Sequence, residues 1–225
     1  QNSAPVFFSL DPDSGTLVRA GTGALSGTQT GTEPPADSNL QTGTQPGSNV
    51  QEGADQTDFR DVPSSFWGAP YVAKVAQAGL MTGTGTDTFD PNGSLTLSQV
   101  MVLAYQIHSQ EHGGVLPQTG GAWYMPYYQY CLDEGILTPG RFRASTLDSA
   151  ASRFDMVEIL DRAIPAARMT QERTVPNGAI PDLDESDFYG DLVYKWYRAG
   201  LVTGDTTGRF HGADGITRAE TAVIL

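Results

Sequence analysis

Apolar residues recur at helical spacing in the segment that begins near Phe59. They share one face of a helix with 3.6 residues per turn, and they are Trp67, Tyr71, Val72, Val75 and Ala78. Gly79 follows, where a left-handed helix end is expected. A loop rich in Gly, Thr and Asp comes next, and a second apolar stripe runs from Val100 to Ile107. The pattern predicts a helix, a loop and a second helix.

The same pattern returns 121 positions later without a gap. The equivalent pairs are Asp61 and Asp182, Trp67 and Phe188, Gly83 and Gly204, Phe89 and Phe210, and Thr96 and Thr217. A degenerate copy, displaced from the first by 56 positions, places Trp123 and Ser152 in register with Trp67 and Thr96. The residues of its loop are divided differently around the loop aromatic, but the number of residues between its two helices is the same. Repeats of this kind are single supersecondary units used several times, and they usually bind rather than catalyse.

The repeats predict an all-α fold of three helix–loop–helix units, with boundaries at 59–112, 120–170 and 179–225. Residues 21–58 are rich in Gly, Thr, Ser, Gln and Pro and contain no aromatic residue, which is typical of a flexible linker. Residues 1–20 predict a short β-hairpin, or the end of an upstream region. Gln1 is not an initiator residue and Leu225 falls inside the last predicted helix, so we expect a longer product.

Composition excludes several classes of partner. The net charge is −13 and no basic stripe is visible, which argues against nucleic acid and anionic membranes as main partners. No run of 18 apolar residues occurs, so no membrane insertion is expected. Cys131 is the single cysteine, which rules out an intrachain disulfide and a Cys-rich zinc site. It replaces Val75 in the repeat register, so we expect it to be buried.

Cofactor, metal and catalytic motifs are not found. His108, His112 and His211 have no companions in a ligand pattern. The segment starting Asp182-x-Asp184 lacks the glycine and glutamate of a calcium loop. No nucleophile elbow, phosphate loop or dinucleotide fingerprint is present. We therefore predict neither a metal nor a cofactor, and no enzyme.

Each predicted second helix opens with a capping-box sequence. A hydroxyl side chain accepts from the amide three residues on, and the side chain there reaches back to the first amide. The pairs are Thr96 and Gln99, Ser152 and Asp155, and Thr217 and Glu220. On this interpretation these residues start helices, at about 1 kcal/mol for each cap.

Arg153 and Arg218 follow two of these caps and are not needed by them. A cation in the first turn opposes the helix dipole. An arginine beside exposed helix amides suits an incoming carboxylate or phosphate, because the guanidinium group and the amides can donate hydrogen bonds to the same anion. The alternative is a solvated surface arginine.

Taken together, the Thr-Arg-Ala-Glu opening at 217–220, the first-helix aromatics and the Gly-Leu helix ends resemble the S-layer homology family over 59–225. The resemblance implies a pseudo-threefold helical bundle of three repeats with a sugar-binding groove between neighbours. It implies that this module grips a secondary cell-wall polysaccharide attached to peptidoglycan, often carrying pyruvyl ketals. It implies an extracellular location on a bacterial cell wall, held there without a covalent bond.

The resemblance also assigns candidate ligand-binding residues. They are Arg153, Arg218, Asp61, Asp182, Trp67, Trp123, Gly83 and Gly204. Each also has a structural interpretation: the tryptophans (with Trp196) as core, the aspartates as loop caps, and the glycines as backbone geometry. Leu97 stands where repeat 1 should have its arginine, Phe188 replaces the third tryptophan, and repeat 2 lacks the early aspartate. We expect at least one groove to be weak.

Two other functions stay open at this point. One is a protein-binding or self-assembling helical module of a surface protein. The other is a wall hydrolase, which would need two carboxylates converging in one cleft with at least one raised pKa.

Overall fold

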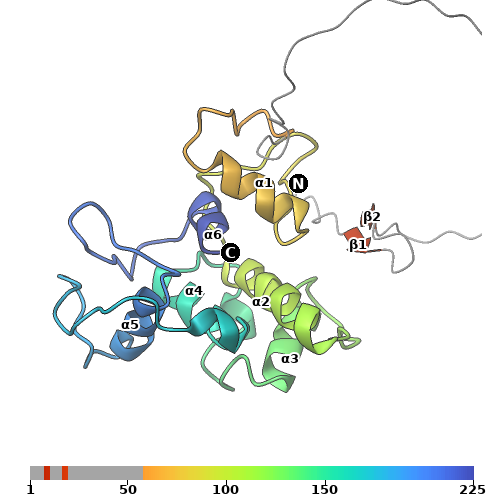
Figure 1. Ribbon diagram of the computed structural model, residues 1–225. Helices are drawn as coiled ribbons and strands as arrows, with labels where there is room; N and C mark the ends of the chain where they lie inside the picture. The colour runs from red at the N-terminus through yellow and green to blue at the C-terminus, as the bar shows by residue number, and fades with distance from the viewer. Residues whose placement is uncertain (1–7, 11–16, 20–57) are drawn as a thin grey trace, which may run out of the picture. The chain divides into compact units, whose positions relative to one another are not determined.

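A computed structural model describes residues 8–10, 17–19 and 58–225 of the chain (Figure 1). The chain divides into two units, Gln1–Ala54 and Asp55–Leu225. In the first, β1 (Phe8–Leu10) pairs antiparallel with β2 (Leu17–Arg19), and Ser9 lies opposite Val18. The connection between these strands and nearly all of the predicted linker 21–58 lie outside the described residues. The hairpin and the linker therefore stay predictions.

The described part of the second unit is mostly helical. Its α-helices are α1 (Ala69–Gln77), α2 (Leu97–His112), α3 (Met125–Asp133), α4 (Arg153–Leu160), α5 (Gly190–Arg198) and α6 (Arg218–Ile224). Two short 3₁₀ helices cover Ala144–Thr146 and Ala166–Met169. Among the described residues, no helix is long and apolar enough to cross a membrane.

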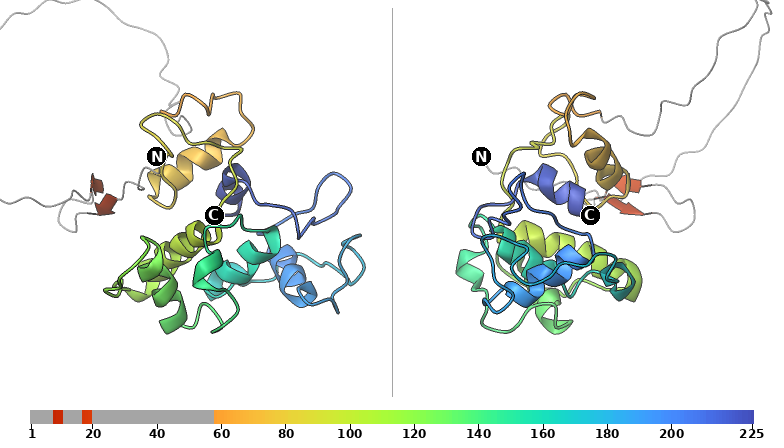
Figure 2. Two further views of the ribbon diagram at one scale, coloured as in Figure 1. Left: turned by 180° about the vertical axis from the view of Figure 1, so that it is seen from behind. Right: turned by 60° about the vertical axis from the view of Figure 1, so that its left-hand side comes forward.

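The helices form three sequential pairs, α1 with α2, α3 with α4, and α5 with α6. Each odd-numbered helix packs on the even-numbered helix of a neighbouring pair. Thus α3 packs on α2, α5 packs on α4, and α1 packs on α6, while α2 also packs on α4. Figures 1 and 2 show α6 beside α1 although the two are far apart in the sequence. The first and last helices of this unit therefore close the arrangement on itself.

Three backbone hydrogen bonds form a closed cycle at the centre of the unit. The N–H of Leu95 donates to the carbonyl of Ile216 (3.1 Å), Ile216 to Ala151 (3.1 Å), and Ala151 back to Leu95 (2.8 Å). All three residues are buried, and each comes shortly before one of the even-numbered helices. Burial of these paired groups is tolerated because every donor and acceptor has a partner.

The core contains Trp196 and Cys131, both fully buried as predicted. Burial raises the pKa of the Cys131 thiol to about 12, so it behaves as a small apolar side chain rather than a reactive thiol. The structural interpretation of Trp67 and Trp123 as core residues is wrong. Their exposed fractions are 59% and 41%, since both lie just before a first helix rather than inside it.

Candidate ligand-binding site

Capping boxes open all three even-numbered helices. The hydroxyls of Thr96, Ser152 and Thr217 each accept from the amide three residues on, and the side chains of Gln99, Asp155 and Glu220 accept from the amides of these three cap residues. The caps leave the next two amides of each helix to be satisfied by other groups.

Carbonyls of the neighbouring helix pair satisfy those amides. The N–H of Arg218 donates to Gly93 (2.9 Å), that of Arg153 to Asp214 (2.9 Å), and that of Leu97 to Ser149 (3.0 Å). The following amide in each helix is bonded in the same way. The expectation that exposed helix amides flank the two arginines is therefore wrong, because the fold itself uses these donors to join one pair to the next.

Arg218 is directed into the protein and not toward solvent. It is 8% exposed, and its guanidinium lies 4.4 Å from the centre of the Phe89 ring. Its Nε donates to the Phe89 carbonyl (2.7 Å) and its Nη2 to the Thr82 carbonyl (2.6 Å). Burial lowers the pKa of Arg218, partly opposed by Asp90 and Asp61. The side chain thus fastens α6 to the loop between α1 and α2.

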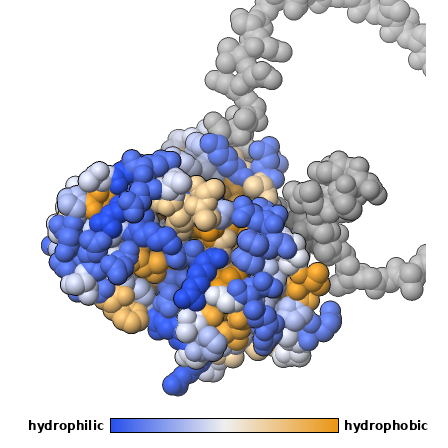
Figure 3. Space-filling model, turned by 60° about the horizontal axis from the view of Figure 1, so that its bottom comes forward, coloured by the Kyte–Doolittle hydropathy of each residue, from blue (hydrophilic) through white to orange (hydrophobic). Residues whose placement is uncertain are grey.

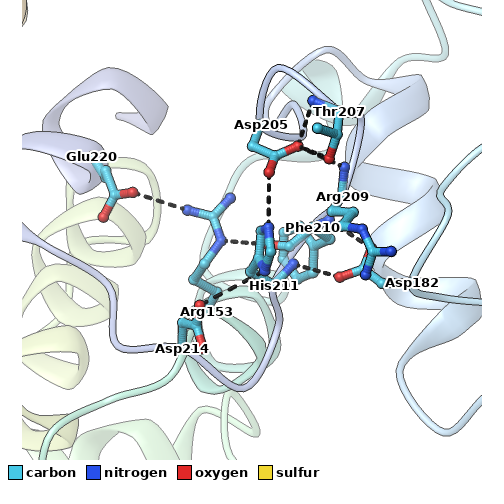
Figure 4. A network of polar contacts seen from close by, with 9 residues as sticks. All are labelled: Arg153, Asp182, Asp205, Thr207, Arg209, Phe210, His211, Asp214 and Glu220. Atoms are coloured by element: carbon cyan, nitrogen blue, oxygen red, sulfur yellow. Dashed lines mark hydrogen bonds and ion pairs between the residues drawn. The ribbon is translucent and has the colours of Figure 1, made fainter.

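Arg153 makes the equivalent contacts between the start of α4 and the loop that joins α5 to α6. Its Nε donates to the carbonyl of Phe210 (2.8 Å), and its guanidinium lies 4.8 Å from the centre of that ring. A looser ion pair of 3.5 Å joins it to Glu220 (Figure 4). Since Glu220 also caps α6, Arg153 ties the start of α4 to both the next loop and the next helix. Its side chain is 14% exposed, somewhat more than that of Arg218.

Asp61 and Asp182 hold the same two loops by accepting hydrogen bonds from loop amides. Asp61 accepts from the amides of Phe89 (2.8 Å) and Asp90 (2.7 Å), and Asp182 accepts from those of Phe210 and His211 (both 2.8 Å). Burial alone would raise the pKa of each carboxyl, but the backbone donors outweigh it and the pKa is lowered. The aspartates hold a turn in which Asp90 and His211 adopt positive φ.

Gly83 and Gly204 lie where these loops approach backbone closely. A Cβ at Gly83 would come within 2.6 Å of the Thr88 carbonyl oxygen, and one at Gly204 within 2.4 Å of Gly208 backbone atoms. A side chain cannot be placed at either position without moving backbone. Both glycines therefore shape the loops that the arginines and aspartates hold.

The loop of the middle pair is fastened differently. By register, Leu97 should reach the Phe142 carbonyl, as Arg218 reaches Phe89, but leucine has no donor. The hydroxyl of Tyr128 on α3 donates to that carbonyl instead, at 2.9 Å. Leu97, which stands in the arginine position, and the altered loop that contains Phe142 therefore lie at the same junction, between α2 and the middle helix pair.

Tyr128→Phe should lower the free energy of unfolding by about 1 kcal/mol, because the Phe142 carbonyl loses its side-chain donor. Urea unfolding followed by circular dichroism measures the change. Tyr71→Phe is the matched control, since Tyr71 is 42% exposed. If the two variants are equally stable, the Tyr128 hydroxyl does not take over the role that an arginine plays at the other two loops.

Exposed aromatic residues precede all three odd-numbered helices. Trp67, Trp123 and Phe188 occupy equivalent positions in the repeat register, and Phe188 is 85% exposed. Trp67 lies against Phe66, Trp123 against Tyr124 and Tyr127, and Phe188 against Tyr189. On the face drawn in Figure 3, apolar residues lie in small groups among polar ones.

Sequence reasoning missed Arg141. Its guanidinium is bonded to Glu158 at 2.9 Å and lies 5.8 Å from the centre of the Phe188 ring. It directly precedes Phe142, the loop aromatic of the middle segment, which is the signal that could have identified it. Among the described residues, no group of three or more His, Cys, Asp or Glu side chains could hold a metal ion.

Comparisons with known proteins relate parts of the chain to one family and to two larger proteins. Residues 58–101 and 179–222 match the S-layer homology domain family. The chain is 21% identical over 174 residues to an S-layer protein of Bacillus thuringiensis subsp. finitimus, covering 74% of this chain and 21% of that protein. It is 25% identical over 175 residues to an endoglucanase of Bacillus sp. (strain KSM-635), covering 74% of this chain and 18% of that protein. The chain spans about a fifth of the length of each.

Proposed function

We propose that residues 59–225 act as a non-covalent cell-wall anchor, since the S-layer homology domain is a cell-wall anchoring module. On this proposal three repeats form a pseudo-threefold bundle, and the junctions between them bind an acidic secondary cell-wall polysaccharide, such as a pyruvylated one. The segment would hold its protein on the cell surface of a bacterium. The match of two segments to this family and the likeness to an S-layer protein support the proposal.

The observation that carries the polysaccharide assignment is the set of exposed aromatics at equivalent positions. Trp67, Trp123 and Phe188 each stand at the start of a helix that packs on the neighbouring pair. Flat aromatic side chains exposed at a junction offer a surface on which sugar rings can pack. The cycle of hydrogen bonds through Leu95, Ala151 and Ile216 supports the threefold arrangement.

The contacts of Arg153 and Arg218 favour a different part for them in this mechanism. Each has donors committed to a loop carbonyl and a face committed to a phenylalanine ring. We propose that they are mainly positioning residues, which together with Asp61 and Asp182 fix the loops beside the aromatics. A loop held in place before binding reduces the entropy cost of association.

Removing the aromatics should weaken binding to wall material. Trp67→Ala and Trp123→Ala should each reduce the affinity for Bacillus wall sacculi about tenfold, a change of about 1.4 kcal/mol. Co-sedimentation with sacculi before and after chemical removal of the secondary polysaccharide measures this. Val115→Ala, at a residue that is 86% exposed, is the control and should bind normally.

The same assay separates the other two functions. A self-assembling or protein-binding module would bind stripped and intact sacculi equally, which would contradict the polysaccharide proposal. A wall hydrolase would clear the suspension. The S-layer homology domain is non-catalytic, and the endoglucanase relative matches this chain over 18% of its own length, so we expect no clearing.

A further inference from the structure

Two histidine rings stack at the C-terminal end of α2. His108 and His112 lie one helical turn apart, with ring centroids separated by 4.2 Å and an interplanar angle of 12°. The Nδ1 of His112 lies 3.1 Å from the carbonyl oxygen of His108, and because a carbonyl only accepts, this nitrogen carries a hydrogen. His108 is 9% exposed, whereas His112 is exposed. Two positively charged rings at this distance repel each other, so the stack disfavours a charge on both.

His108 also connects α2 to α3. Its Nδ1 forms a buried hydrogen bond of 2.9 Å with the hydroxyl of Tyr130, a residue that is 3% exposed. The backbone after α2 lies against the same hydroxyl, since a Cβ at Gly114 would overlap with it. The hydroxyl of Tyr105 donates to the Gly114 carbonyl at 3.4 Å. The bond between His108 and Tyr130 therefore lies where α2, α3 and the start of the segment between them meet.

The surroundings of His108 favour its neutral form. Burial lowers the pKa of His108, the charge of His112 lowers it further, and Glu134 and Glu111 partly oppose this. The folded chain therefore binds this proton less readily than the unfolded chain, whose histidine pKa is about 6.5. The free energy of unfolding should be unaffected by His108 above that value and should decrease as the pH falls from it through the lower folded pKa. The titratable groups around His108 and Tyr130 come from α2, from α3 and from the residue after α3, and they are Tyr105, Glu111, His112, Cys131 and Glu134.

A chain of aromatic contacts leads from this hydrogen bond to Trp123. The ring of Tyr130 lies edge-on to that of Tyr105, with 4.8 Å between centroids, and the ring of Tyr105 lies edge-on to that of Tyr127 at 5.4 Å. Tyr127 in turn contacts the ring of Trp123 at 6.4 Å. Tyr127 and Tyr130 are buried, and closely packed side chains transmit a displacement because few voids absorb it. A displacement of Tyr130 should therefore reach Trp123.

We propose that His108, His112 and Tyr130 form an acid-sensitive contact between α2 and α3, here called the histidine latch. At neutral pH the buried hydrogen bond and the stacked rings hold the end of α2 against α3. In mild acid both histidines take up protons, the two charged rings repel each other, and the end of α2 separates from Tyr130. Residues 113–124 then become more mobile, and Trp123 loses its fixed position. The histidine latch does not depend on which ligand Trp123 contacts, so it stands or fails separately from the proposed function.

Hydrogen–deuterium exchange of the full chain at pH 7.5 and at pH 5.5, followed by mass spectrometry, tests the histidine latch. Both pH values lie above the ordinary pKa of carboxyl groups, so the difference between them mainly reports histidines. After correction for intrinsic exchange rates, amides of residues 105–133 should exchange at least about fivefold faster at pH 5.5, as expected for repulsion between two charges about 4 Å apart. Amides of α5 should change little.

Three variants assign this acid response to the stacked pair. His112→Gln removes one charge and leaves the bond between His108 and Tyr130, so its acid response should be smaller than that of the unaltered chain. His108→Gln combined with His112→Gln should abolish the response. His211→Gln is the matched control, because it removes the third histidine of the chain, whose ring is bonded within the loop between α5 and α6. This variant should keep the full response.

The histidine latch is wrong if residues 105–133 of the unaltered chain respond to acid no more than α5 does. It is also wrong if the double variant keeps the full response. A double variant that already exchanges rapidly at pH 7.5 would have lost the packing of α2 on α3, and His112→Gln alone then decides. A response of His112→Gln equal to that of the unaltered chain would overturn the repulsion between the two rings.

Discussion

Arg218→Ala is expected to lower the free energy of unfolding by about 3 kcal/mol. The guanidinium is buried and supplies donors to the carbonyls of Phe89 and Thr82. A buried carbonyl that loses its partner costs about 1–3 kcal/mol; this applies fully to the Phe89 carbonyl and in part to the half-buried Thr82 carbonyl. The contact with the Phe89 ring is lost as well. Urea unfolding of the full chain, followed by tryptophan fluorescence and by circular dichroism, measures the change.

Two variants show whether the charge or the geometry of the Arg218 side chain is responsible for its contribution to stability. Arg218→Lys keeps the charge but cannot reach both carbonyls with a planar fork, so its stability should fall between those of the alanine variant and the unaltered chain. Arg162→Ala removes an exposed arginine and should change stability by less than about 0.5 kcal/mol. A stable Arg218→Ala variant that no longer binds sacculi would contradict the positioning role and favour a direct ligand contact.

Loss of the two aspartate clamps should make the fold less sensitive to acid. The pKa of Asp61 and that of Asp182 are lowered in the folded state, so their stabilising contribution is complete above the unfolded value of about 3.9. It is lost as the pH falls through the lower folded values. Asp61→Asn should therefore cost about 2 kcal/mol at neutral pH, and Asp182→Asn less because Asp182 is exposed to solvent. Both costs should shrink as the pH falls through the lowered folded values.

Urea midpoints between pH 7 and pH 2 measure this difference. Asp184, Glu185 and Asp205 also have lowered pKa values, so the unaltered chain should lose stability in acid for several reasons. Only the difference between the two proteins reports the clamps. A constant difference across the pH range would show that the carboxylate charge is unimportant to these turns.

Local signals in the sequence predicted the helices well. The apolar spacing before Gly79 and the capping box at Thr96 depend on residues within a few positions of each other, and both elements occur where the pattern indicates. Trp196 and Cys131 were also predicted to be buried, because they fall on the inner face of their helices. Periodicity is sufficient where burial is decided by one helix.

The contacts of the arginines could not be predicted in this way. Arg218 and its acceptor at Phe89 are 129 positions apart, and no local rule brings them together. A first-turn arginine therefore indicated an external anion, whereas the Nε and Nη2 of Arg218 already donate to carbonyls of the protein. Trp67 was misjudged because it lies at the helix start, where the apolar stripe no longer decides which side faces the core.

The cycle through Leu95, Ala151 and Ile216 makes the helix pairs depend on one another during folding. In a linear repeat array each unit contacts only its neighbours, and folding can begin anywhere. Here α1 packs on α6, the last of the described helices, so its partner forms only after residues 218–224 have been made. Contacts of such large sequence separation slow folding, and we expect them to join the three helix pairs in a single cooperative transition. A chain without residues after 214 would leave the N–H of Leu95 and the carbonyl of Ala151 unpaired, so we expect it to open more readily to proteases.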